Sequence, residues 1–265
     1  MKIKELVSAL ERFAPLPLQD GFDNAGLQIG LTEVEATGAL LCLDVTEAVL
    51  DEAIALGHNL VISHHPLIFK GYKSITGKDY VERCILKAIK NDIVIYSAHT
   101  NLDNAYGGVN YKIAEKIGLK NLQVLEPKEN SLQDDLMQAG AGIVGELDEP
   151  ETELEFLKRI KKTFEVGCVR HNRLTGREIQ KVALCGGAGA FLLPQAIRAG
   201  ADVFITGEIK YHDYFGHEGD ILMAEIGHYE SEQYTKEIFY SIIRDLFPNF
   251  ALQSSKINTN PIKYL

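Results

Sequence analysis

The spacing of hydrophobic residues alternates along the chain between a helical pattern and a strand pattern. Residues 3–14 carry apolar side chains at helical spacing, and Pro15 and Pro17 end that helix. Short apolar runs then alternate with amphipathic segments. The predicted strands are 40–43, 60–63 and 93–97, and the predicted helices are 46–56, 81–90 and 109–117. This alternation predicts an α/β fold with a largely parallel sheet.

A second block of sequence repeats this order of elements. When the chain is shifted by 143 positions, identical residues align without a gap, namely Cys42 with Cys185, Ala53 with Ala196, Ile54 with Ile197, Gly57 with Gly200 and Ile62 with Ile205. The two aligned glycines suit the left-handed turn that ends a helix before the next strand. The pattern favours an internal duplication over a chance match of two strand–helix–strand units.

Polar residues follow the predicted strands at equivalent points. His64 and His65 come directly after 60–63, and the segment from His99 to Asp103 follows 93–97. In the second block, the segment that holds His228 and Glu232 follows the predicted strand 221–225. Because open α/β sheets bind ligands beyond the carboxyl ends of their strands, we expect these segments to meet across one cleft between the halves.

These residue types in combination predict a metal site. Taken alone, each motif has a simpler explanation: His64 and His65 could be a surface pair, and His228 and Glu232 could lie on the charged face of a surface helix. Adjacent imidazoles such as His64 and His65 point in different directions and can therefore serve two neighbouring ions. His228 and Glu232 are four residues apart, which places both on one face of a helix. Imidazoles mixed with carboxylates suit zinc, manganese, iron or cobalt better than calcium or magnesium.

Composition excludes several other classes of protein. The 27 basic and 37 acidic residues give a net charge of −10, which disfavours binding to nucleic acids or membrane surfaces. We expect neither a membrane-spanning segment nor a signal sequence, because no uninterrupted apolar run is long enough to cross a membrane and residues 1–5 have no apolar signal core. The four cysteines lack CxxC spacing, so we expect a cytoplasmic protein without disulfides. We interpret the basic cluster 158–162 as a solvated helix face, and expect the polar run 253–260 to fray or act as an arm.

Several motifs together resemble one known family, the NGG-one-interacting-factor-three-like family. The motifs run over essentially the whole chain and are Pro17, Asp23–Gly30, Ser63–Leu67, Ser97–Asp103, Gly107–Asn110, Thr206–Glu208 and Gly227–Glu232. Bacterial members are often labelled "GTP cyclohydrolase 1 type 2 homolog". Phe22 stands where the family usually has tryptophan, and the chain lacks the ferredoxin-like insert of longer relatives.

The resemblance implies two similar, intertwined α/β halves, which we place at 1–125 plus 230–265 and at 126–229. It also implies a homohexameric ring and a dinuclear centre with two divalent transition-metal ions per chain, zinc first, with manganese, iron or cobalt as alternatives. The family's ligands match His64, His65, Asp103, His228 and Glu232 here, with Glu232 bridging both ions.

The leading functional hypothesis is a metal-dependent hydrolase of an unidentified small molecule that contains a phosphoester, nucleotide or cyclic amidine bond. His99, outside the five ligands, is the candidate catalytic residue that moves protons or orients Asp103. The alternative is a non-catalytic ring that stores or delivers metal or serves as a scaffold. The glycine-rich run 186–190 lacks the Lys-Ser/Thr of a phosphate loop, so we interpret it as a strand-to-helix turn, although its amides could hold an anion.

Overall fold

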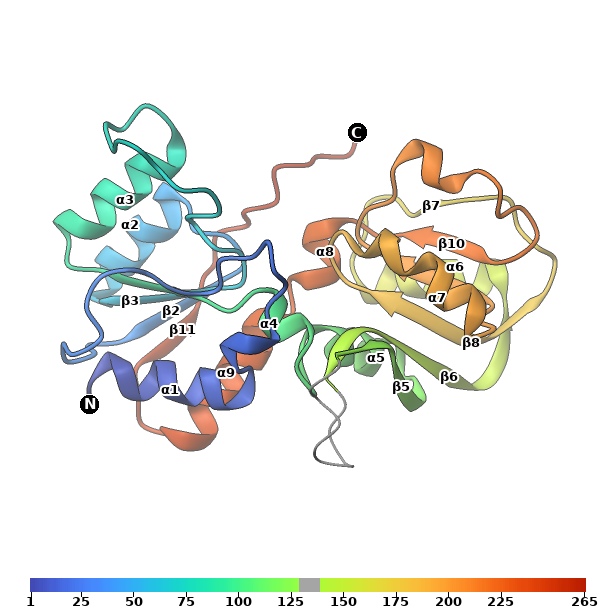
Figure 1. The fold of residues 1–265 in the computed structure, drawn as a ribbon, viewed down its shortest axis with the longest axis horizontal. Helices are drawn as coiled ribbons and strands as arrows, with labels where there is room; N and C mark the ends of the chain where they lie inside the picture. The colour runs from blue at the N-terminus through green and yellow to red at the C-terminus, as the bar shows by residue number, and fades with distance from the viewer. Residues whose placement is uncertain (129–138) are drawn as a thin grey trace. The chain divides into compact units, whose positions relative to one another are not determined.

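The computed structural model describes residues 1–128 and 139–265 (Figure 1). The described residues form two compact units. The first unit comprises Met1–Leu102 and Thr235–Pro261, and the second comprises Asp103–Tyr234 and Ile262–Leu265. The sequence-based division into 1–125 plus 230–265 and 126–229 also has a discontinuous first part, and its boundaries remain a prediction.

The first unit is built on a mixed sheet with the strand order β1-β4-β3-β2-β11. Strands β2, β3, β4 and β11 are parallel, and β1 pairs with β4 in the antiparallel direction. The elements of this unit are α1 (Ile3–Phe13), η1 (Leu16–Leu18), β1 (Gly26–Ile29), β2 (Ala39–Cys42), α2 (Glu47–Leu56), β3 (Leu60–Ser63), α3 (Tyr80–Lys90), β4 (Val94–Ser97), α9 (Thr235–Leu246) and β11 (Leu252–Ser254). The predicted strands and helices of this region match these bounds to within one or two residues.

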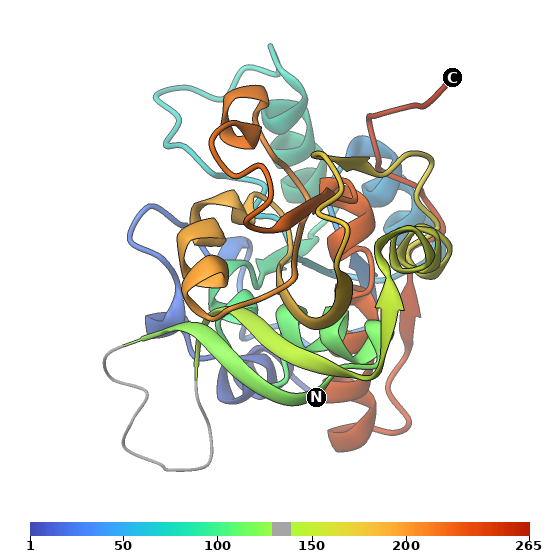
Figure 2. The same cartoon turned by 90° about the vertical axis from the view of Figure 1, so that its right-hand side faces the viewer.

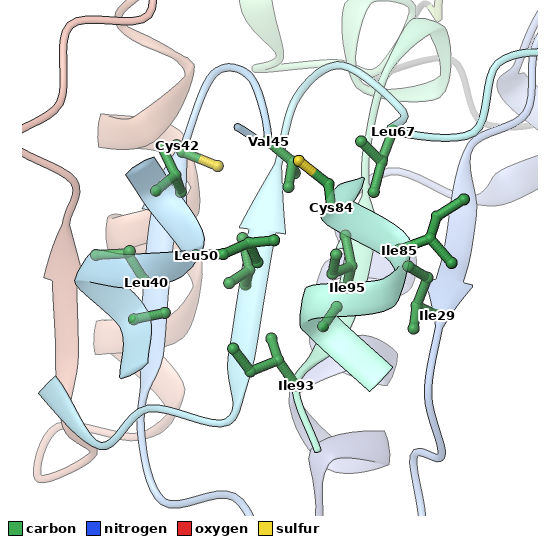
Figure 3. Close-up of a cluster of buried hydrophobic side chains, with 14 of the residues drawn as sticks. Ile29, Leu40, Cys42, Val45, Leu50, Leu67, Cys84, Ile85, Ile93 and Ile95 are labelled. Atoms are coloured by element: carbon green, nitrogen blue, oxygen red, sulfur yellow. The ribbon is translucent and has the colours of Figure 1, made fainter. Parts of the chain in front are cut away.

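Helices cover both faces of the first sheet (Figure 1). Helices α2 and α3 pack on one face, where Leu50 and Cys84 meet Leu40 and Ile95 of the strands (Figure 3). Helices α1 and α9 cover the other face, toward which Tyr96 points its hydroxyl group to Glu11 of α1. Both faces are buried, so the strands are continuous apolar runs, as expected for a parallel sheet.

The second unit is built on a mixed sheet with the strand order β5-β6-β8-β9-β10-β7. Strands β8, β9 and β10 are parallel, whereas β5, β6 and β7 join antiparallel. The long strands β5 and β6, in green and yellow-green, lie side by side (Figure 2). Its elements are α5 (Val109–Ile117), β5 (Lys120–Pro127), β6 (Gly140–Thr152), α6 (Glu153–Thr163), β7 (Arg170–His171), β8 (Glu178–Cys185), η3 (Gly189–Leu192), α7 (Leu193–Arg198), β9 (Val203–Thr206), η4 (Tyr211–Tyr214), β10 (Leu222–Glu225) and α8 (His228–Glu232). A short helix, α4 (Thr100–Asp103), crosses the boundary of the two units.

One pair of neighbouring parallel strands in each unit, β2 with β3 and β8 with β9, has the same register. Leu41 of β2 pairs with Ile62 of β3, and Leu184 of β8 pairs with Ile205 of β9, so each pair is shifted by the same 143 positions. Gly57 and Gly200, also aligned by this shift, both adopt left-handed backbone angles, with φ of 70° and 69°. This agreement in topology is what a duplication would produce, and the duplication itself stays a prediction.

Two smaller expectations concern membranes and cysteines. Among the described residues, no helix is both apolar enough and long enough to cross a membrane. The four cysteines are free thiols, and Cys42 and Cys185 are buried in strands, as the apolar runs around them predicted.

Candidate metal centre

The three histidines of the first unit lie together at one edge of its sheet. Strands β3 and β4 are parallel neighbours that end in register at Ser63 and Ser97, whose hydroxyl oxygens are 2.8 Å apart. The residues that follow both strands therefore emerge at the same edge. The ring centres of His64, His65 and His99 are separated by 4.9 to 5.5 Å. One ring nitrogen from each lies within 4.8 Å of the others, a spacing at which they could hold an ion.

The backbone fixes the tautomer of His64. Its side chain is fully buried, and its Nδ1 lies 2.8 Å from the carbonyl oxygen of Ala98. A carbonyl oxygen can only accept a hydrogen bond, so Nδ1 must carry the proton. Nε2 is therefore the nitrogen that remains for a metal ion, as in other metal-ligating histidines.

Carboxylates orient the other two histidines of this cluster in the same way. Nδ1 of His65 lies 2.7 Å from Oδ1 of Asp44, and Nδ1 of His99 lies 2.7 Å from Oδ1 of Asp23. Burial is the largest single influence on Asp44 and opposes its ionised form, but the hydrogen bond and charge of His65 and the hydrogen bond from Thr259 together outweigh burial and hold the pKa of Asp44 below its usual value. Ionised carboxylates accept hydrogen bonds, so each ring carries its proton on Nδ1 and presents Nε2.

Asp23 gains additional hydrogen bonds from the turn at the start of α4. Its Oδ2 accepts from the backbone N–H of Thr100 at 3.0 Å and from the hydroxyl of Thr100 at 2.5 Å. Burial raises the pKa of Asp23, but the bonds from His99 and Thr100 outweigh burial and lower that pKa to about 2. Asp23 therefore stays ionised and holds His99 in place.

We expect Asp23→Asn to destabilise the metal-free protein in a pH-dependent way. The folded-state pKa of about 2 lies below the ordinary value of 3.8, so the stabilisation is present above pH 3.8 and is lost as the pH falls through 2. The difference in unfolding free energy between wild type and variant should be on the order of 1–2 kcal/mol at pH 7 and should shrink toward pH 2. This difference in unfolding free energy is measured by denaturant titrations at several pH values, with a chelator present to keep the protein metal-free. Asp245→Asn, at an exposed site on α9, is the control, and a pH-independent difference at Asp23 would contradict the assignment.

In the second unit, helix α8 presents a histidine and a carboxylate on one face, as the spacing of four residues predicted. Nε2 of His228 lies 3.1 Å from Oε2 of Glu232. Nδ1 of His228 lies 2.8 Å from Oε1 of Glu208, which follows β9, so this ring too is oriented through Nδ1 by a carboxylate. A carboxylate oxygen of Asp103, at the end of α4, lies within 4.8 Å of one from Glu232.

The glycine-rich segment after β8 is the tight strand-to-helix turn that the sequence predicted. Side chains already accept from three of the amides that could have held an anion, and anion binding by this turn stays a prediction. The N–H groups of Gly186, Gly187 and Gly189 donate at 2.9 to 3.0 Å to Asn110, Ser231 and Thr206, respectively.

This turn also makes room for Glu232. A Cβ on Gly187 would lie 2.3 Å from Oε1 of Glu232, and the φ of +58° at this position disfavours other residues. Gly187 is therefore needed where the backbone passes close to the carboxylate.

The predicted site residues therefore lie close together in two groups, one within each unit. The first unit brings together His64, His65 and His99, and the second brings together Asp103, His228 and Glu232. His99, predicted to lie outside the ligands, belongs to the first group. The imidazoles of the first group and the imidazole and carboxylates of the second are donor types that suit zinc, manganese, iron or cobalt.

Sequence reasoning did not assign a role to the carboxylates that orient the rings. Glu208 follows β9 and belongs to the motif Thr206–Glu208, but its role as the partner of His228 was not predicted. Asp44 follows β2 and was missed, although the rule that polar residues after strands mark a site would have found it. Asp23 lies before the edge strand β1 in a loop, and nothing in its spacing marks it.

Comparison with known proteins identifies the family. A family model described as Duf34/NIF3 (NGG1p interacting factor 3) matches residues 1–261. A Clostridium perfringens protein named "GTP cyclohydrolase 1 type 2 homolog" is 38% identical over 235 residues, covering 88% of this chain and 87% of that protein. A Lactococcus lactis protein of the same name is 34% identical over 271 residues, covering 98% of each.

Solved structures agree. The crystal structure of a Staphylococcus aureus hypothetical protein has a TM-score of 0.89 and 32% identity, covering 100% of this chain and 99% of that one. A Bacillus cereus protein related to NIF3 has a TM-score of 0.89, 26% identity and the same coverage. Family match, sequence relatives and fold therefore agree that this chain belongs to the Duf34/NIF3 family.

Proposed function

We propose that this protein is a metal-dependent hydrolase whose ions are bound by His64, His65, Asp103, His228 and Glu232. The observation that supports it most strongly is the orientation of the histidines. Each of the four candidate rings is hydrogen-bonded through Nδ1 to a carbonyl or carboxylate oxygen and presents Nε2. Metal-ligating histidines usually have such an outer partner, whereas a surface histidine needs none.

We further propose two ions per chain, with zinc as the first candidate and Glu232 as the shared ligand. When bound, a pair of such ions supplies Lewis-acid activation of a phosphoester, nucleotide or cyclic amidine substrate and of water. Within this proposal His99 transfers the proton. Its Nδ1 is held by the ionised Asp23, which leaves Nε2 as the ring nitrogen that faces away from Asp23 and can take up or release a proton.

Shortening Glu232 to aspartate tests catalysis against metal storage. The change withdraws the carboxylate by one methylene, roughly 1.5 Å, and a misplacement of that size can lower a rate ~100-fold. A hydrolase should lose most of its turnover and keep part of its metal, because the other ligands remain. Metal content by elemental analysis and hydrolysis of a generic phosphodiester should be measured together, with Glu230→Asp on the same helix as the matched control.

The outcomes of this experiment separate the two candidate functions. Full metal content in wild type without turnover on phosphodiesters, nucleotides and cyclic amidines would favour the non-catalytic ring. Turnover that is unchanged in Glu232→Asp would place the chemistry elsewhere in the molecule. Glu230→Asp should leave both metal content and turnover near the wild-type values.

We propose a homohexameric ring as the assembly state, on the basis of family membership. Light scattering coupled to size-exclusion chromatography should therefore give six times the chain mass of 29.4 kDa. A monomer at micromolar concentration would reject the ring.

A further inference from the structure

The C-terminal strap, residues 252–261, is fastened along the first unit and does not fray or extend as an arm, which corrects the expectation for 253–260. It begins as β11, which pairs in parallel with β2, and the N–H of Ser255 then donates to the carbonyl of Leu41 at 2.7 Å. Glu52 on α2 holds the next turn, because its carboxylate accepts from the Ser255 hydroxyl at 2.5 Å and from the Lys256 N–H at 3.0 Å. Ile257 packs against the core.

Beyond this anchor, the strap reaches the carboxylate that orients a candidate metal ligand. The hydroxyl of Thr259 donates to Oδ2 of Asp44 at 2.5 Å, and Oδ1 of the same carboxylate accepts from Nδ1 of His65 at 2.7 Å. The two oxygens of Asp44 thus have separate donors. A chain of hydrogen bonds runs from the strap to His65 across 215 residues of sequence between Thr259 and Asp44.

Packing alone does not fix the Asp44 carboxylate. Its side chain is 34% exposed, and it lines a cavity of about 330 Å³ together with His65, Thr259, Tyr80 and Pro261. A carboxylate beside open space can rotate about its terminal bond unless a hydrogen bond holds it. Among the contacts described, the Thr259 hydroxyl and the His65 ring hold the plane of the carboxylate, and Thr259 is the one that is independent of His65.

We propose that Thr259 is a positioning residue of the metal centre, acting through Asp44 to hold the His65 ring with Nδ1 protonated and Nε2 directed to the ion. This inference rests on the proposed function, since it assumes that His65 is a ligand. Loss of the residue that hydrogen-bonds to a metal-ligating histidine typically lowers metal affinity 10- to 100-fold. Thr259 bonds to Asp44 and not to His65 itself, so we expect an effect at the lower end of this range, about tenfold.

The test compares two substitutions at one position. Thr259→Val keeps the branched shape and removes the donor, whereas Thr259→Ser keeps the donor. Zinc affinity, measured by competition with a chromogenic chelator on the full chain, should fall about tenfold in Thr259→Val and stay within about twofold of wild type in Thr259→Ser. Ser255→Ala is the matched control, because it loosens the strap at Glu52 without touching Asp44, and its zinc affinity should not change.

Coupling and tautomer measurements separate positioning from general stability. In an Asp44→Asn background, adding Thr259→Val should weaken zinc binding little further, because both changes break the same chain of bonds. The ¹⁵N spectrum of the metal-free protein should show His65 protonated at Nδ1 in wild type and in Thr259→Ser, with mixed tautomers in Thr259→Val.

Three results would overturn the inference. They are wild-type affinity in Thr259→Val, an equal loss in Ser255→Ala, and fully additive effects of the Asp44 and Thr259 changes. A wild-type protein that binds none of zinc, manganese, iron and cobalt would instead reject the proposed function. The tautomer spectrum of the metal-free protein would still decide whether Thr259 orients His65.

Discussion

Replacing His64 by alanine should lower zinc affinity by more than about 100-fold, because it removes a ligand and not merely the partner of one. His64 is fully buried and its ring is held at the edge of the sheet by the Ala98 carbonyl. Elemental analysis after dialysis and chelator competition measure the loss.

The same substitution should also destabilise the metal-free protein. It leaves a cavity at the end of β3 and removes the donor for a buried carbonyl, which together cost on the order of 2–4 kcal/mol of unfolding free energy. His171→Ala is the control, because that side chain is exposed on β7 and bonds only to the adjacent Asn172 carbonyl among the contacts described. Equal metal loss in both variants, or full metal content in His64→Ala, would remove His64 from the ligand set.

Gly187→Ala should separate metal binding from stability. The new Cβ would lie 2.3 Å from Oε1 of Glu232, and the carboxylate, as the end of a flexible side chain, can move aside at little cost to folding. Its new position would be wrong for a ligand, so we expect zinc affinity to fall at least about tenfold, as for other disturbances of a ligand's surroundings. The left-handed backbone adds about 1–2 kcal/mol of strain.

Gly200→Ala is the matched control for that strain. Gly200 has a φ of +69° against +58° for Gly187, and nothing lies within 4 Å of its Cβ position. Both variants should therefore lose similar unfolding free energy in denaturant titrations, whereas only Gly187→Ala should lose zinc. Wild-type affinity in Gly187→Ala would mean that Glu232 does not need its present position, and an equal zinc loss in Gly200→Ala would assign the effect to backbone strain.

The hydrophobic pattern predicted the central elements because their burial is regular. Strands β2, β3 and β4 are buried on both faces and read as continuous apolar runs, and the amphipathic helices α3 and α5 have strong periodicity. Edge strands were not predicted. Strand β5 is largely exposed and has no alternation to detect, and β7 contains only Arg170 and His171. Whether β5 and β7 form strands depends on the neighbouring strands with which they pair, and the local sequence does not encode that pairing.

The sequence by itself determined the kinds of donor and their order, since the rule that parallel strands end at a common edge places His64, His65 and His99 together. Only the tertiary structure decided which atoms of these rings face outward. That choice depends on Ala98, Asp44 and Asp23 meeting Nδ1 within 2.8 Å. A hydrogen bond acts only at contact distance, and residues as far apart in sequence as Asp23 and His99 reach that distance only when the sheet has formed.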